Sequence, residues 1–232
     1  MVQEVNLSNG LKVVSEFNPN VESISLGVWV KVGTRHEDAE INGIAHMLEH
    51  MAFKGTATRS AQQIAQEVEY VGGDINAYTS MEATAYHIRI LKDHMPLAMD
   101  IIADILQNSV FDPEEFLKER EVILQEIGQA YDTPDDIIFD YFQHHCFPGQ
   151  SLGRPILGSA QVIKNLNPGQ VKGFMDAHYG AKQMILSAAG YVDQDQLLDL
   201  AHEKFDGLHQ DLYRPWEEGQ YIGGEARYQR DL

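Results

Sequence analysis

The stretch from residue 24 to residue 32 alternates between aliphatic residues and residues of other kinds. The aliphatic positions are Ile24, Leu26, Val28, Val30 and Val32. Because successive side chains of a β-strand point to opposite faces, this period of two predicts a strand with one well-buried face. The fold must therefore contain a sheet with something packed against that face.

Three other segments predict further strands. Residues 2–17 predict a hairpin, because Asn9 and Gly10 can supply the positive φ angles that a type I′ turn requires. Residues 74–91 predict two more strands joined by a turn, and the apolar run at 182–190 predicts a buried strand.

Sequence patterns typical of helices occur in most of the remaining chain. Ser60 and Gln63 form a capping box, and Asp112 followed by Pro113 is typical of a helix start. Strands come first, then several helices, then one strand and one helix. This order predicts an α+β fold with a mixed, largely antiparallel sheet and helices packed on it. Helices are expected at 60–73, 93–108, 112–131, 134–146, 167–179 and 193–205.

The charge balance excludes some classes of partner. A net charge of −18 argues against nucleic acid and against an anionic membrane. No apolar run approaches the roughly 18 residues that cross a bilayer, and the first residues lack the pattern of a signal peptide. An acidic surface is compatible with cationic peptides or metal ions.

Cysteine usage indicates the compartment. Cys146 is the single cysteine, so no intrachain disulfide can form and a reducing, cytoplasmic location is expected. The run His144-His145-Cys146 is a poor metal cluster, because adjacent residues on a helix point in divergent directions.

The sequence GIAHMLEHMAFKGT, residues 43–56, places three polar side chains in an otherwise apolar stretch. On a helix, His46 and His50 lie about 40° apart and Glu49 falls beside them. Two imidazoles one turn apart can bind one metal ion, and H-x-x-E-H is the inverse of the common zinc-peptidase motif. A single match also arises by chance, and a catalytic zinc site needs a third protein ligand.

Two carboxylates on the predicted helix 112–131 are candidates for that ligand. Glu119 and Glu126 are seven residues apart, so they lie within about 20° of each other on a helix. Both sit at the margin of an apolar stripe, from which a carboxylate can reach a metal. Spacing alone does not say which of them binds, and solvated helix charges are the alternative. The stripe comprises Phe116, Ile123 and Ile127.

With these residues in view, the chain resembles the pitrilysin/insulinase family of zinc metallopeptidases, and within it the processing-peptidase β subunits and their bacterial relatives. The blocks that carry the resemblance are NGLKVV, GIAHMLEHMAFKGT, GGDINAYTSMEATAYH, EREVILQEIGQ and LGRPILG. The family's third ligand lies about 76 residues after the second histidine, and Glu126 stands at that distance from His50.

The resemblance implies roles for individual residues. His46, His50 and Glu126 become the ligands of one zinc ion, although such a donor set also suits manganese or cobalt. Glu49 becomes the general base that takes a proton from the attacking water. Glu119 becomes the supporting carboxylate that orients a ligand histidine or the site.

The resemblance also implies how a peptide substrate binds. Asn76, Ala77, Tyr78 and Thr79 match an edge strand to which an extended or unfolded peptide adds through main-chain hydrogen bonds. Asp136 and Asp140 resemble an acidic pair that holds an arginine near the cleavage site. Without the resemblance these residues indicate only an ordinary sheet edge and two exposed aspartates.

Members of the family usually contain two homologous halves. The resemblance therefore divides the chain into a catalytic half-domain, 1–210, and a linker with the first strand of a second half, 211–232. Either the chain is part of a longer subunit, which we favour, or its partner half is a separate polypeptide. A dimer, an extended peptide substrate that can contain arginine, and a bacterial, cytoplasmic setting are expected.

The leading hypothesis is a zinc metalloendopeptidase that favours sites near basic residues. One alternative is a non-catalytic peptide-binding or scaffold subunit of a heterodimeric peptidase, but such subunits usually lack the ligands or the base, and here His46, Glu49, His50 and Glu126 are all present. The other is an acidic interaction domain with a fortuitous motif.

Overall fold

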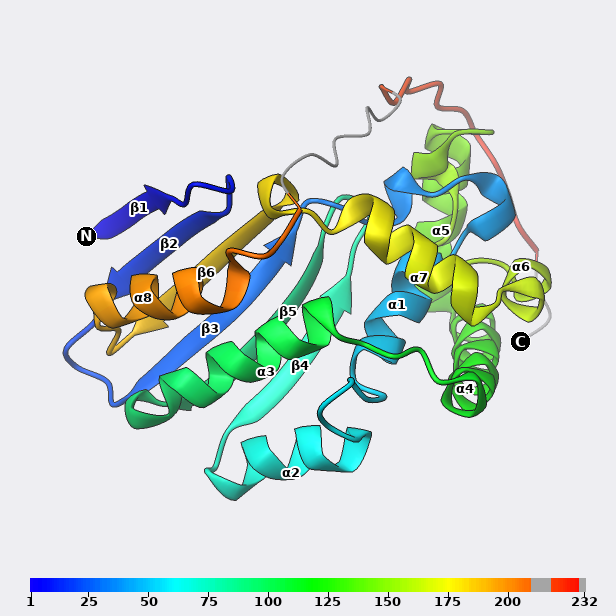
Figure 1. Cartoon of the computed structure of the whole chain (residues 1–232). Helices are drawn as coiled ribbons and strands as arrows, with labels where there is room; N and C mark the ends of the chain where they lie inside the picture. Colours follow the sequence, from blue (N-terminus) through cyan, green and yellow to red (C-terminus); the bar gives the residue numbers. More distant parts are fainter. Residues whose placement is uncertain (210–217, 230–232) are drawn as a thin grey trace.

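A six-stranded sheet forms the centre of the fold (Figure 1). The computed structural model describes residues 1–209 and 218–229. The strand order across the sheet is β1-β2-β6-β3-β5-β4. The pair β2 and β6 is parallel, and every other neighbouring pair is antiparallel, as the sequence predicts. The strands are β1 Val2–Asn6, β2 Lys12–Phe17, β3 Ser23–Val30, β4 Asp74–Thr79, β5 Thr84–Leu91 and β6 Met184–Gly190.

The hairpin β1-β2 forms, but the prediction of a type I′ turn is wrong. Gly10 has a φ of +93°, whereas Asn9 does not have a positive φ. The loop closes instead with Gly10 N donating to Leu7 O, followed by Leu11 N donating to Asn9 Oδ1. The Asn9 amide also donates to Phe205 O, so this buried side chain ties the hairpin loop to the end of α8.

Helices cover one face of the sheet and extend beyond one end of it. In Figure 1, α3 and α8 lie in front of the sheet, with α3 running roughly along the strands, while α1, α4, α5, α6 and α7 gather beyond one end of the sheet. The α-helices are α1 Ile44–Ala52, α2 Ala61–Tyr70, α3 Met95–Gln107, α4 Pro113–Asp132, α5 Pro134–Cys146, α6 Ala160–Asn165, α7 Pro168–His178 and α8 Gln194–Phe205. The short 3₁₀ helices are Thr34–His36, Ala39–Ile41, Lys92–His94, Ser151–Gly153 and Ala181–Gln183.

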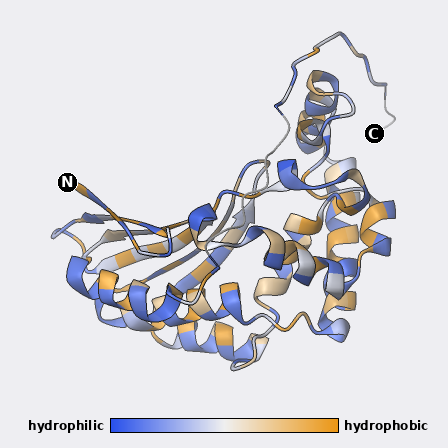
Figure 2. Ribbon diagram, turned by 45° about the horizontal axis from the view of Figure 1, so that its top comes forward, coloured by the Kyte–Doolittle hydropathy of each residue, from blue (hydrophilic) through white to orange (hydrophobic). Residues whose placement is uncertain are grey.

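The alternating strand is β3, and its aliphatic side chains are buried as predicted. They join one apolar core with residues of α1, α3, α7 and α8. Figure 2 shows hydrophobic and hydrophilic residues alternating along the covering helices, as expected for amphipathic helices with one face on the core. The opposite sheet face carries exposed residues such as Trp29 and Arg89.

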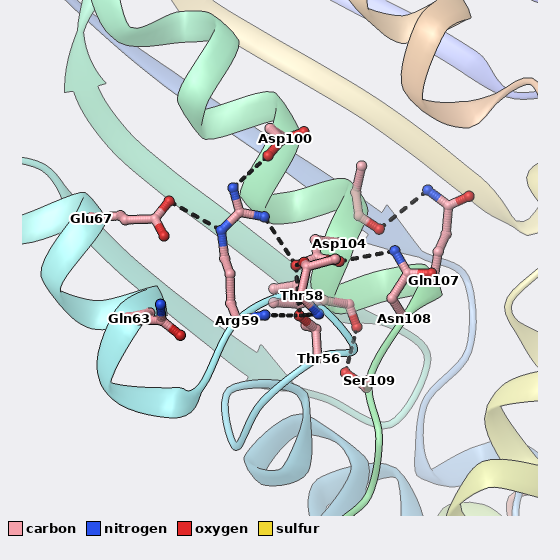
Figure 3. A network of polar contacts seen from close by, with 12 residues as sticks. Thr56, Thr58, Arg59, Gln63, Glu67, Asp100, Asp104, Gln107, Asn108 and Ser109 are labelled. Atoms are coloured by element: carbon pink, nitrogen blue, oxygen red, sulfur yellow. Dashed lines mark hydrogen bonds and ion pairs between the residues drawn. The ribbon is translucent and has the colours of Figure 1, made fainter.

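A polar network locks the loop after α1 to α2 and α3 (Figure 3). Asp104 of α3 accepts hydrogen bonds from the hydroxyls of Thr56 and Thr58 at 2.7 and 2.8 Å. Arg59 contacts three carboxylates, at distances of 2.5 to 3.0 Å. We call this the Arg59 network: Thr56, Thr58, Arg59, Glu67, Asp100 and Asp104.

The sequence located the strands and long helices but missed α6. Residues 218–229 contain no regular secondary structure. The predicted linker and strand at 211–232 lie partly on 210–217 and 230–232, outside the described residues. The division near residue 210 therefore stays a prediction.

Candidate metal centre

Helix α1 carries the motif histidines and begins at a position that requires glycine. Gly43, its N-cap, has a φ of +95°, and a Cβ there would lie 2.7 Å from Leu157 O and from Ile163 Cδ1. Glycine therefore lets the helix start in close contact with the segment before α6.

A buried carboxylate takes the place of a side-chain cap on α1. Glu37 accepts from Ala45 N through Oε1 and from Gly43 N through Oε2, each at 2.8 Å, and Asn42 Nδ2 also donates to Oε2 at 2.8 Å. Burial raises the pKa of Glu37 to about 7, against the lowering effect of these hydrogen bonds. Because Glu37 accepts from two backbone N–H groups that have no partner within the helix, it fixes the start of the motif helix.

The two motif histidines lie side by side one helical turn apart. The ring centroids of His46 and His50 are 4.6 Å apart, with an angle of 72° between the ring planes. Burial, and then the charge of His50, lowers the pKa of His46 to about 4, so its imidazole is neutral at pH 7. Neutral imidazole is the form that binds a metal.

Glu126 of α4 lies close to both of these histidines. Its Oε2 lies 3.7 Å from both His46 Nε2 and His50 Nε2. That separation exceeds a hydrogen bond and is close to the ~3.4 Å expected between ligands of a tetrahedral zinc with bonds near 2.1 Å. Among the described residues, His46, His50 and Glu126 form the one group whose donor atoms could hold a metal ion. The donor set fits zinc.

The neighbouring carboxylate, Glu119, contacts His50 rather than the open centre. Its Oε2 lies 2.9 Å from His50 Nδ1, and its Oε1 lies 2.7 Å from Lys54 Nζ. Burial would raise the pKa of Glu119, but the hydrogen bonds from Lys54 and His50 outweigh it and lower the pKa. The structure thus separates the two candidates that sequence spacing left open.

Glu49 lies beside the three candidate ligands without belonging to their group. Its Oε2 accepts a 2.6 Å hydrogen bond from Thr79 Oγ1, at the end of β4. Burial raises the pKa of the Glu49 carboxyl, and the Thr79 hydrogen bond opposes that rise. Thr79 therefore links β4 to the Glu49 carboxylate, and this link was not expected from the sequence.

Strand β4 is the last strand of the sheet, next to α1. Its burial alternates: Asn76 and Tyr78 are exposed, whereas Ala77 and Thr79 are half-buried. The outer edge of β4 pairs with no other strand in the described part of the chain. An extended segment could add there.

Asp136 and Asp140 lie one turn apart on α5, the helix that follows α4 in the chain and packs against it. Burial and the charge of Asp136 raise the pKa of Asp140. Neither carboxylate forms an ion pair with a described residue.

Comparison with known proteins decides the family. Residues 12–160 match the insulinase family, peptidase family M16. The chain belongs to this family. The predicted resemblance is therefore confirmed, and so is the fold class, because the structure is similar to that of a protease from Helicobacter pylori with a TM-score of 0.88. That match has 27% identity and covers 95% of this chain and 54% of the other.

Curated relatives are more similar to this chain in sequence. An "uncharacterized zinc protease" of Rickettsia felis is 43% identical over 226 residues, which are 97% of this chain and 55% of that protein. The "mitochondrial-processing peptidase subunit beta" of Dictyostelium discoideum is 40% identical over 231 residues, or 97% and 49%. The chain spans about half the length of the curated relatives it matches.

None of the described helices is both long and apolar enough to cross a membrane. The expected cytoplasmic location and the expected dimer stay predictions.

Proposed function

We propose that this M16 chain is the catalytic half of a zinc metalloendopeptidase that hydrolyses extended or unfolded peptides. The observation that supports it most directly is the convergence of His46, His50 and Glu126, whose ligand atoms all lie within 4.8 Å of one another although α1 and α4 are distant in sequence. Bound there, zinc would supply Lewis acidity toward the scissile carbonyl and a water molecule activated near neutral pH.

The chain's own residues would move the proton. Glu49 is adjacent to His50 on α1 and stays outside the ligand group, so its carboxylate can accept the proton of the attacking water and return it to the leaving amine. The Thr79 hydroxyl donates to Oε2 of Glu49 and orients the carboxylate for this transfer. Glu119 fixes His50 from the opposite side through Nδ1.

The peptide would bind as an added strand on β4. Main-chain hydrogen bonding at that edge selects an extended conformation rather than a particular sequence. The residues that would line it are Asn76, Ala77, Tyr78 and Thr79. Because Thr79 touches Glu49, a peptide on this edge would lie next to the proposed base.

Asp136 and Asp140 would favour a basic side chain in the substrate. The raised pKa of Asp140 has burial and the Asp136 charge as its causes, and an arginine guanidinium would relieve the repulsion between the two carboxylates. We infer a preference for arginine-containing peptides from this pair.

A homologous second half, in the same polypeptide or in a partner subunit, would complete the enclosure of the substrate. The relatives are about twice as long as this chain, so the complete enzyme is the proper test of turnover.

The experiment compares wild type with Glu49→Gln in the full-length enzyme. Both should bind one zinc ion per catalytic half, while the variant should lose roughly 10²–10⁴-fold in turnover of an unstructured arginine-containing peptide. Full activity in Glu49→Gln would exclude Glu49 as the general base. Zinc binding with no turnover in wild type would favour the alternative, a non-catalytic peptide-binding or scaffold subunit.

A further inference from the structure

Lys54 contacts the metal centre through Glu119. It lies two residues beyond the end of α1, and its Nζ is 2.7 Å from Glu119 Oε1. The other oxygen of the same carboxylate, Oε2, is 2.9 Å from His50 Nδ1. Glu119 therefore joins Lys54 to one of the three candidate ligands, with one carboxylate oxygen for each partner.

Burial limits the orientations that the Glu119 carboxylate can adopt. The side chain of Glu119 is only 9% exposed, and those of His50 and Lys54 are 16% and 30% exposed. A carboxylate removed from water needs hydrogen-bonded or charged partners, since no solvent can replace them. With Lys54 at Oε1, the carboxylate plane is fixed so that Oε2 faces His50.

The bond at His50 Nδ1 decides which ring nitrogen is free. When Nδ1 carries the hydrogen and donates it to Glu119, the lone pair remains on Nε2. That Nε2 is the atom 3.7 Å from Glu126 Oε2. A free or rotated Glu119 would let the imidazole turn or change tautomer.

The backbone that carries Lys54 is held in place from both sides. Lys54 N donates to Met51 O at 3.1 Å, which closes the turn after α1. Val110 N donates to Gly55 O at 3.2 Å, which joins the same loop to the segment before α4. Downstream, the Arg59 network secures the loop to α3 (Figure 3). These contacts therefore fix the position of Lys54 relative to Glu119.

We propose that Lys54 is a positioning residue of the metal centre: it orients Glu119, and Glu119 in turn fixes the ring and tautomer of His50. The inference rests on the proposed function, in that His50 must be a metal ligand for the contact to matter.

If Lys54 acted only through its charge, removing it would change the zinc affinity in the opposite direction to that expected for a positioning residue. A lysine near a cation site repels the cation, so its loss should tighten zinc binding if Coulomb repulsion were its main influence. If Lys54 acts by orienting Glu119, its loss should weaken zinc binding. The sign of the change separates the two.

The first experiment measures zinc affinity by competition with a chromophoric chelator. Glu119→Gln should weaken binding roughly 10–100-fold, the usual effect of losing a residue that supports a ligand. Lys54→Met should weaken it roughly 10-fold, and the double variant should bind no more weakly than Glu119→Gln alone. Lys118→Met is the matched control, because Lys118 precedes Glu119 on α4 but pairs with Glu115 at the surface. Its affinity should equal that of wild type.

The second measurement reports on His50 directly. In metal-free protein, nitrogen NMR of the imidazoles should show one tautomer of His50, with hydrogen on Nδ1, in wild type and a mixture in Lys54→Met. If Lys54→Met does not fold, Lys54→Gln replaces it, because glutamine can still donate to Glu119 without a charge. The zinc affinity of Lys54→Gln should lie between those of wild type and Glu119→Gln.

Unchanged or tighter zinc binding in Lys54→Met or Lys54→Gln would overturn the inference, as would a full additive loss in the double variant. Wild-type protein that binds no zinc would instead overturn the proposed function itself, and this inference with it.

Discussion

Replacing Glu37 by glutamine should destabilise the fold through the start of the motif helix. Glu37 is 3% exposed, and its two oxygens accept from Ala45 N, Gly43 N and the Asn42 amide. Glutamine has the same shape but one accepting oxygen, and its NH₂ group would face an N–H donor. At least one buried backbone donor would then lose its acceptor.

The expected cost follows from these contacts. A buried unsatisfied N–H costs about 1–3 kcal/mol. The charge itself is left out of this cost, because its favourable interaction with the N-terminus of α1 is opposed by the burial that raises the pKa of Glu37 to about 7. Glu37→Gln should therefore lower the free energy of unfolding by about 1–3 kcal/mol, a substantial part of the ~5–15 kcal/mol typical of a domain.

Urea denaturation at pH 7, with a chelator present so that metal binding does not contribute, measures this difference. Glu40→Gln is the matched control, since Glu40 is exposed three residues away and should change stability by less than ~0.5 kcal/mol. A Glu37→Gln variant within ~0.5 kcal/mol of wild type would refute the capping role.

Three further perturbations test other parts of the structure. Hydrogen bonds outweigh burial and lower the pKa values of Asp100 and Asp104, so the stability they contribute is present above about pH 4 and is lost as the pH falls through their folded-state values. Arg59→Met should cost ~3 kcal/mol at pH 7 and flatten this acid dependence, and thermal unfolding between pH 7 and pH 3 that shows the wild-type slope would contradict the assignment. In the full-length enzyme, Thr79→Val should lower kcat roughly 10-fold at unchanged KM and zinc content while Thr79→Ser retains activity; steady-state kinetics that do not distinguish the two variants would exclude the link to Glu49. Lysine at both Asp136 and Asp140 should slow cleavage of an arginine-containing peptide more than that of a neutral one, and equal slowing would count against an arginine subsite.

The sequence predicted the parts of this protein that depend on local patterns. Alternation identified β3, and the capping boxes and Pro-containing starts located the long helices, because these signals act within a few residues. The H-x-x-E-H spacing placed two imidazoles on one helical face for the same reason.

The contacts that local patterns could not predict join residues distant in the chain. Glu119 lies 69 residues from His50, and Thr79 lies 30 residues from Glu49. No periodicity relates such pairs. The different roles of Glu119 and Glu126 came from the family resemblance, and tertiary packing places Glu119 Oε2 at His50 Nδ1 and Glu126 Oε2 near both imidazoles. The prediction of a type I′ turn at Asn9-Gly10 was wrong for a related reason. The Asn9 amide donates to Phe205 O of α8, a tertiary contact that accompanies a different loop conformation.

The most direct test of the account is the position of zinc in a crystal of the protein grown with the metal, located by anomalous scattering. We predict one strong site with bonds of about 2.0–2.2 Å to His46 Nε2, His50 Nε2 and a Glu126 oxygen. Zinc bound elsewhere, for example at His144 and His145 of α5, with no density between α1 and α4, would contradict it.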